Sequence, residues 1–123
     1  MTLKVNYYNI DIYQKGGIAV KISYDSNKME KILCDERLIK KEYGKMAQNV
    51  MNRMSELRAA PSLANIPCVP PPRRHKLEPH SKNQWGIDIS RNFRIVIEAV
   101  GEFDKEDLSS IKEIRILYLE DYH

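Results

Sequence analysis

The sequence has no apolar run that approaches the roughly 18 residues of a membrane-spanning helix. Its first residues mix Lys, Asn and Asp with apolar side chains, so no secretory signal is expected. Only two cysteines occur, Cys34 and Cys68, without a Cys-x-x-Cys spacing, which favours free thiols over a disulfide. With 42% hydrophobic and 30% charged residues, the 123-residue chain is predicted to form one cytoplasmic domain, residues 1–123.

Several common catalytic motifs are also missing. The chain carries no glycine-rich phosphate loop, no Gly-x-Ser-x-Gly elbow and no His-Glu-x-x-His. The three histidines, His75, His80 and His123, are not at the spacing of helical metal ligands. We therefore expect neither a metal nor another cofactor, and any chemistry would come from the side chains.

The net charge is only +3, but the charged residues are unevenly distributed. Residues 66–94 hold six Lys and Arg against two acidic residues, whereas residues 101–123 hold three against seven. A basic segment rich in Arg and His is what a polyanionic partner requires. Solvated surface charge produces the same composition, so charge alone leaves both interpretations open.

The N-terminal 26 residues have the pattern of β structure. Strand-like runs at residues 2–13 and 18–24 are separated by Gly16-Gly17, which is a hairpin-type turn signal. Residues 1–26 are therefore predicted to add a strand or a hairpin to the domain.

Residues 27–60 are predicted to form a helical hairpin. Asp25 or Ser26 can cap its start, Gly44 is expected to end or bend the first helix, and Pro61 is expected to stop the second. The second helix has an apolar stripe at helical spacing, which predicts core residues rather than a cofactor site. The stripe consists of Met46, Val50, Met54 and Leu57.

Residues 73–123 are predicted to form the sheet. Runs at 83–90, 92–100 and 113–123 alternate apolar and polar residues, and short polar segments separate them. This pattern is typical of an antiparallel meander. The expected fold class is therefore α+β, with an N-terminal helical hairpin packed on a twisted antiparallel β-sheet.

Polar side chains on these strands suggest a chemistry. Arg94 points away from the apolar residues on either side, His75 and Lys76 begin the first strand, and Asp121 and His123 share a facing on the last. If one surface gathers them, the cations can hold a phosphate while a histidine transfers protons. Taken singly, each residue also fits an ordinary surface role.

Three segments resemble a known family. "MAQNVMNRMSELRAAPSLANI" resembles the second helix of small bacterial toxins of the RelE/ParE superfamily, in particular the HigB-like plasmid-maintenance killer proteins. "RRHKLEPHSKNQWGIDISRNFRIVIEAV" resembles the His-Lys-Leu, Trp-x-Ile-x-Ile and aromatic-Arg-Ile segments of that branch. The terminal "EDYH" resembles its usual ending.

The resemblance implies a RelE/ParE-like fold and an activity. HigB-like toxins of type II toxin–antitoxin systems are mRNA interferases, which cleave mRNA on the ribosome without a metal. A cognate antitoxin neutralises them, and we expect one of the helix-turn-helix, HigA-like kind. The implied partners are thus the antitoxin, the ribosome and mRNA, with operator DNA reached only through the antitoxin and no membrane involved.

The resemblance also implies a set of site residues. Metal-free cleavage uses the 2′-hydroxyl of RNA as nucleophile, with a base, an acid and cations around the phosphate. The expected catalytic residues are His75, Arg94, Asp121, Tyr122 and His123. The expected RNA-binding residues are Arg73, Arg74, Lys76, Lys82 and Arg91.

We assign a role to each catalytic residue. His123 or Asp121 is expected near the 2′-hydroxyl and His75 on the opposite side, with acid and base left unordered. Arg94, together with Lys76, is expected on the phosphate, and Tyr122 is expected to stack on or orient a base.

The sequence departs from the family in three places, one of which is that residues 1–20 extend beyond the usual start. "EPHSKNQ" replaces the usual Gly-Asp-Arg-type basic turn, and the 101–113 loop is longer and more acidic. Two alternatives therefore stay open. One is a ParE-like or catalytically silent module that acts by protein binding, and the other is an unrelated α+β interaction domain.

Overall fold

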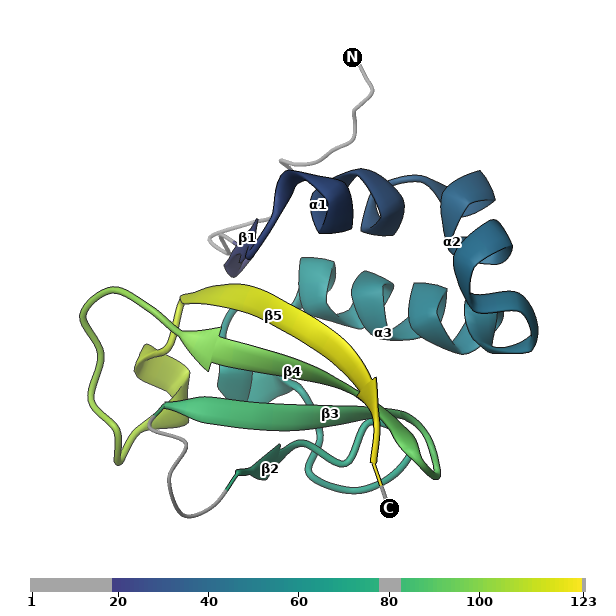
Figure 1. Cartoon of the computed structure of the whole chain (residues 1–123). Coiled ribbons are helices and arrows are strands. Elements are labelled where there is room, and N and C mark those ends of the chain that lie inside the picture. Colours follow the sequence, from purple (N-terminus) through teal and green to yellow (C-terminus); the bar gives the residue numbers. More distant parts are fainter. Residues whose placement is uncertain (1–18, 78–82, 123) are drawn as a thin grey trace.

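The computed structural model describes residues 19–77 and 83–122, and Figure 1 shows an α+β fold with its helices gathered on one side of a sheet. The elements in this part of the chain are β1 (Lys21–Tyr24), α1 (Asn27–Leu33), α2 (Glu36–Tyr43), α3 (Ala47–Ala59), β2 (His75–Lys76), β3 (Gln84–Ser90), β4 (Phe93–Ala99) and β5 (Glu113–Asp121). Short 3₁₀ turns follow α2, α3 and β4. The predicted run at 2–13 lies outside the described residues.

The described strands form one mixed sheet in the order β1-β5-β4-β3-β2. The predicted antiparallel meander is confirmed for β2 to β5. The predicted N-terminal addition contributes β1, whose direction was not predicted and which pairs parallel to β5. Alternation of apolar and polar residues carries no information on strand direction. A tight hairpin can join only antiparallel strands, whereas the long connection from β1 to β5 allows the two strands to run parallel or antiparallel.

The helices begin and end at residues with clear local signals. The Ser26 hydroxyl caps α1 by accepting a hydrogen bond from the Met29 N–H at 3.1 Å. Asp35 caps α2 in the same way, so the first predicted helix is divided into α1 and α2. Gly44 then ends α2 with a φ of +52°, as predicted for a helix-ending glycine. Helix α3 ends at Ala59, before Pro61.

The core lies between α3 and the sheet. On α3, Val50, Met54 and Leu57 are buried, as predicted, whereas Met46 is only partly buried. The isoleucines that face them from the sheet are fully buried: Ile87, Ile95, Ile97, Ile114 and Ile116. Within the described residues, no helix has the length and apolar composition that crossing a bilayer would need.

The sheet surface that faces away from the helices carries the alternate residues, and we call it the polar face. On β2 this face carries His75, whose cross-strand partner on β3 is Gly86. Its residues on β3, β4 and β5 are Gln84, Gly86, Asp88, Arg94, Val96, Glu98, Arg115, Tyr118 and Glu120. The residue types on this surface differ sharply from those of the core, because three acidic and two basic side chains lie on it.

A β-bulge interrupts the pairing of β4 with β5. Ile97 pairs with Ile116, but the next residue, Val96, pairs with Tyr118, so Leu117 is an extra residue. The extra residue reverses the facing of everything that follows it on β5. The bulge thereby decides which residues at the C-terminal end reach the polar face.

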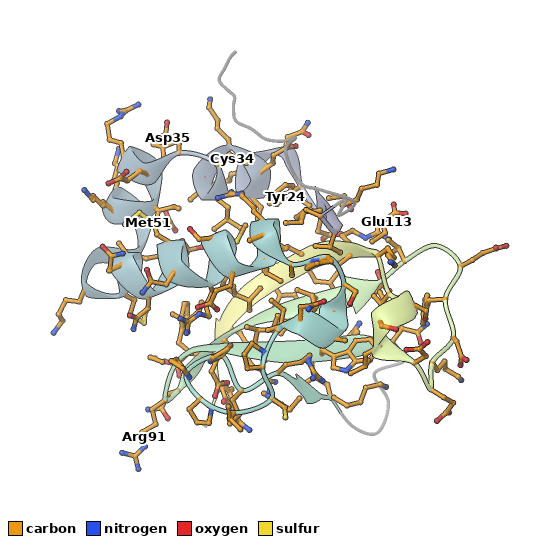
Figure 2. The ribbon with its side chains drawn as sticks, turned by 180° about the vertical axis from the view of Figure 1, so that it is seen from behind. Tyr24, Cys34, Asp35, Met51, Arg91 and Glu113 are labelled. Carbon is orange, nitrogen blue, oxygen red and sulfur yellow. The ribbon has the colours of Figure 1, made fainter. Side chains whose placement is uncertain are left out.

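Replacing Met54 by Ala should lower the free energy of unfolding by about 2 to 5 kcal/mol, because it leaves a cavity under a fully buried side chain. Met51, which is only partly buried on the same helix (Figure 2), is the matched control. Met51→Ala should cost about 1 kcal/mol or less. Urea unfolding of both variants measures the difference. Equal losses would contradict the placement of α3 against the sheet.

Candidate functional site

Asp88 is the buried charge at the centre of the polar face, and its side chain is 12% exposed. The Arg73 guanidinium donates from Nε to Oδ2 at 2.6 Å and from Nη2 to Oδ1 at 3.2 Å. The Tyr122 hydroxyl donates to Oδ1 at 2.8 Å. The carboxylate thus accepts three hydrogen bonds, which is how a protein keeps a buried charge stable.

Tyr122 attaches the end of the described chain to this carboxylate. Its hydroxyl also accepts a hydrogen bond from Arg73 Nη2 at 2.8 Å, and its N–H donates to the Asn92 carbonyl at 2.7 Å. Burial, followed by the hydrogen bond to Asp88, raises the pKa of the Tyr122 phenol above its usual value of 10.0. Tyr122 is therefore uncharged at neutral pH and cannot serve as a general base there.

Arg94 lies on top of Tyr122 and beside Glu120. Its guanidinium carbon is 4.2 Å from the centre of the Tyr122 ring, a cation–π contact. Its Nε donates to Glu120 Oε2 at 2.7 Å, and Nη2 is 2.5 Å from the same oxygen. The guanidinium is therefore fixed on one face by a ring and along one edge by a carboxylate.

His75 meets Arg94 over Gly86. A Cβ atom added at Gly86 would lie 2.9 Å from both Cε1 and Nε2 of His75 and 3.2 Å from Cδ of Arg94. Only a glycine leaves room for the imidazole there. The structure therefore brings a histidine and an arginine to one point of the polar face.

The tautomer of His75 follows from its backbone contact. Nδ1 lies 2.8 Å from the Arg73 carbonyl oxygen, which can only accept, so Nδ1 carries a proton. Nε2 is then the ring nitrogen that keeps a free lone pair in the neutral imidazole, and it lies above Gly86. Arg73 has a φ of +40°, a conformation that costs about 1 kcal/mol or more for a residue with a side chain.

The polar face holds four of the ten predicted site residues. Arg73, His75, Arg94 and Tyr122 are joined by the contacts described above. Arg74 instead donates to the Ile66 carbonyl at 2.8 Å. Arg91 is exposed in the turn after β3 and projects outward in Figure 2. Lys82 and His123 lie outside the described residues.

Two predicted placements do not hold. Lys76 pairs with Trp85, and its Nζ is 5.2 Å from the centre of that ring, so it belongs to the sheet surface opposite His75. Asp121 pairs with Phe93 and is out of phase with Arg94, so it too lies on the other surface. For Lys76 the physical reason is the period of two along a strand, which separates it from His75. For Asp121 the reason is the bulge at Leu117, which reverses the facing of the residues after it. Arg94 therefore shares no face with Lys76 or Asp121.

Three residues of the site were not predicted: Gly86, Asp88 and Glu120. Asp88 lies between two buried isoleucines of β3, and a charge in that position is a signal that it has a partner. Glu120 is two residues before Tyr122, so it shares the facing of that ring. Strand alternation could have found both carboxylates but not the arginine that each of them binds.

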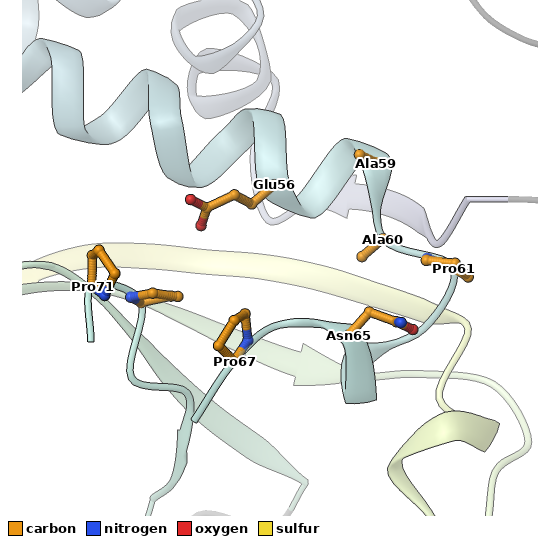
Figure 3. Close-up of a pocket in the computed structure, with 8 residues that line it drawn as sticks. Glu56, Ala59, Ala60, Pro61, Asn65, Pro67 and Pro71 are labelled. Atoms are coloured by element: carbon orange, nitrogen blue, oxygen red, sulfur yellow. The ribbon is translucent and has the colours of Figure 1, made fainter. Parts of the chain in front are cut away.

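A separate pocket of about 360 Å³ lies between the end of α3 and the loop after it (Figure 3). Prolines and alanines form most of its wall, and Glu56 is its one ionisable residue. Glu56 Oε1 is 2.9 Å from Nε of Arg53, whose side chain is 6% exposed. This pocket offers an apolar surface but no acid–base pair. In the described residues, no three metal-ligating side chains come together either.

Replacing Gly86 by Ala should lower the free energy of unfolding by about 1 to 3 kcal/mol, because the new methyl group overlaps the imidazole. In a His75→Ala background the same change should cost less than half as much, since the two closest atoms are gone and the next, Cδ of Arg94, belongs to a flexible side chain. Urea unfolding of the four proteins gives the coupling energy. Equal costs in both backgrounds would contradict the contact of His75 with Gly86.

Comparisons with known proteins identify no relative of this chain, because no family model, no curated protein and no solved structure matches it.

Proposed function

We propose that the chain is the toxin of a type II toxin–antitoxin system, a HigB-like endoribonuclease that cleaves mRNA on the ribosome. The observation that carries the proposal is the meeting of His75 and Arg94 over Gly86. A proton-transfer group and a cation at one point are what cleavage of a phosphodiester requires. The resemblance of residues 46–66 and 73–100 to this family supplies the substrate.

The 2′-hydroxyl of RNA and the side chains of the protein supply all the groups that the proposed reaction uses. The 2′-oxygen attacks the neighbouring phosphorus, the bond from phosphorus to the 5′-oxygen breaks, and a 2′,3′-cyclic phosphate remains. One group takes the 2′-hydroxyl proton and a second gives a proton to the leaving 5′-oxygen. His75 is assigned one of these transfers through Nε2, because Nδ1 is held by the Arg73 carbonyl.

The other roles are assigned by position. Arg94 balances the charge that develops on the phosphate. Tyr122 holds Arg94 in place, and the Arg73 carbonyl holds the His75 imidazole. The second proton transfer is assigned to His123 from the resemblance alone. Asp121 is no longer assigned a part in the phosphate site, since it lies on the other sheet surface.

The partners follow from the same surface. The exposed Arg91 lies at the end of the sheet that also carries Tyr122, where it can contact ribosomal RNA or mRNA backbone. The antitoxin is proposed to be a protein that binds stoichiometrically and closes the polar face to RNA. An acidic segment would suit this purpose, because it can pair with Arg73 and Arg94.

A protein-binding module of the ParE type is the second candidate. The observation that favours it is the pairing of the arginines on this surface with carboxylates, Arg73 with Asp88 and Arg94 with Glu120. A surface whose charges balance internally attracts a polyanion less strongly than an unpaired basic patch does.

Expression of the wild type in bacteria should arrest growth and produce new mRNA 5′ ends, and His75→Ala should reduce cleavage by about 100-fold or more. Arg94→Ala should reduce it by a similar order, because it removes the cation at the phosphate. Arg37→Ala is the control, since that side chain is 83% exposed on α2. Mapping 5′ ends measures the effect. Equal arrest by all four proteins without mRNA cleavage would overturn the proposal in favour of the protein-binding module.

A further inference from the structure

Glu120 pairs with Arg94 and so occupies the cation that the proposed reaction needs. Nε and Nη2 form the edge of a guanidinium that best matches a carboxylate or a phosphate, and both lie against Glu120 Oε2. A phosphate group that approaches Arg94 therefore finds this edge already taken. It must either displace the Glu120 carboxylate or bind beside it against a negative charge.

The second ion pair of the site differs in a way that identifies the displaceable carboxylate. Asp88 is 12% exposed and accepts from both Arg73 and Tyr122, so moving it away would leave the donors of two residues without their shared acceptor. Glu120 is 32% exposed, and within the described part of the chain its side chain pairs with Arg94 alone. The Glu120 carboxylate can therefore turn toward water at little cost, whereas that of Asp88 cannot.

Arg94 would keep its position after Glu120 moves away. The Tyr122 ring lies under its guanidinium at 4.2 Å, and Tyr122 is itself fixed by Asp88 and Arg73. The stack restrains the plane of the guanidinium independently of Glu120. The two contacts thus have separable effects: Tyr122 holds the guanidinium in position, and Glu120 binds its hydrogen-bonding edge.

We propose that Glu120 is an internal competitor of the RNA phosphate for Arg94, so that this carboxylate weakens the binding of RNA. The inference rests on the proposed function, because it takes the ligand of Arg94 to be an RNA phosphate. It also explains how a surface with balanced charges can serve a polyanion, since displacing one carboxylate exposes one cation.

The chain offers a matched control for Glu120. Glu98 and Arg115 form a second ion pair between β4 and β5 on the polar face, with an Arg115 Nη2 to Glu98 Oε1 distance of 3.3 Å. The side chains of Glu98 and Glu120 are 31% and 32% exposed. Glu98→Gln and Glu120→Gln therefore remove the same charge from similar surroundings, but only one of them lies at Arg94.

Binding of a short single-stranded RNA that carries 2′-O-methyl groups, and so cannot be cleaved, tests the inference by fluorescence anisotropy. Glu120→Gln should bind about fivefold more tightly, as expected for freeing one half-exposed ion pair, while Glu98→Gln should change affinity less than twofold. In an Arg94→Ala background, Glu120→Gln should have no further effect beyond that of the control. Circular dichroism and thermal unfolding establish that each variant is folded.

The outcomes separate this inference from the proposed function. If Arg94→Ala weakens binding and Glu120→Gln leaves it unchanged or weakens it, Glu120 positions Arg94 instead, and the competition is overturned while the proposed function stands. Equal tightening by Glu98→Gln would also overturn it, because the effect would be one of net charge. If Arg94→Ala binds RNA as tightly as the wild type, Arg94 is not the phosphate ligand, and both proposals fail.

Discussion

The buried carboxylate of Asp88 is the contact on which the geometry of the polar face depends. It joins β3 to Arg73, which precedes it by 15 residues, and to Tyr122, which follows it by 34. Arg73 supplies the carbonyl that fixes the imidazole of His75, and Tyr122 supplies the ring that supports Arg94. A carboxylate in this position needs all its donors, so these segments are held together or the charge is left uncompensated.

The elements of the fold were largely predictable because their signals are local. Ser26, Gly44 and Pro61 act through their own backbone and side-chain geometry, and burial follows the helical spacing on α3. The direction of β1 was not predictable, because its partner is more than 80 residues away along the chain. Asp35 was missed as a helix start for another reason: the apolar spacing continues through it, so only the cap marks the boundary.

The candidate site shows the same division between local and distant information. His75, Arg94 and Tyr122 were expected from their strands, but their relation to one another depends on the register between strands. The carboxylates Asp88 and Glu120 decide what the arginines can do, and no local pattern pairs them with Arg73 and Arg94. Asp121 was expected beside Arg94 because the facing of residues on β5 was judged without its bulge.

Because Leu117 is an extra residue, the side chains that β5 presents on the polar face depend on the number of residues in the strand as well as on their identity. In an unbroken ladder, Leu119 would face Arg94, and Glu120 would turn toward Phe93 and the apolar core. Such a ladder, with Leu117 opposite Val96, would exchange the two surfaces of the strand after Ile116 without altering any polar side chain. Removing Leu117 would instead close the bulge and keep Tyr118 opposite Val96 and Glu120 opposite Arg94, so the polar face requires either the bulge or a strand that is one residue shorter.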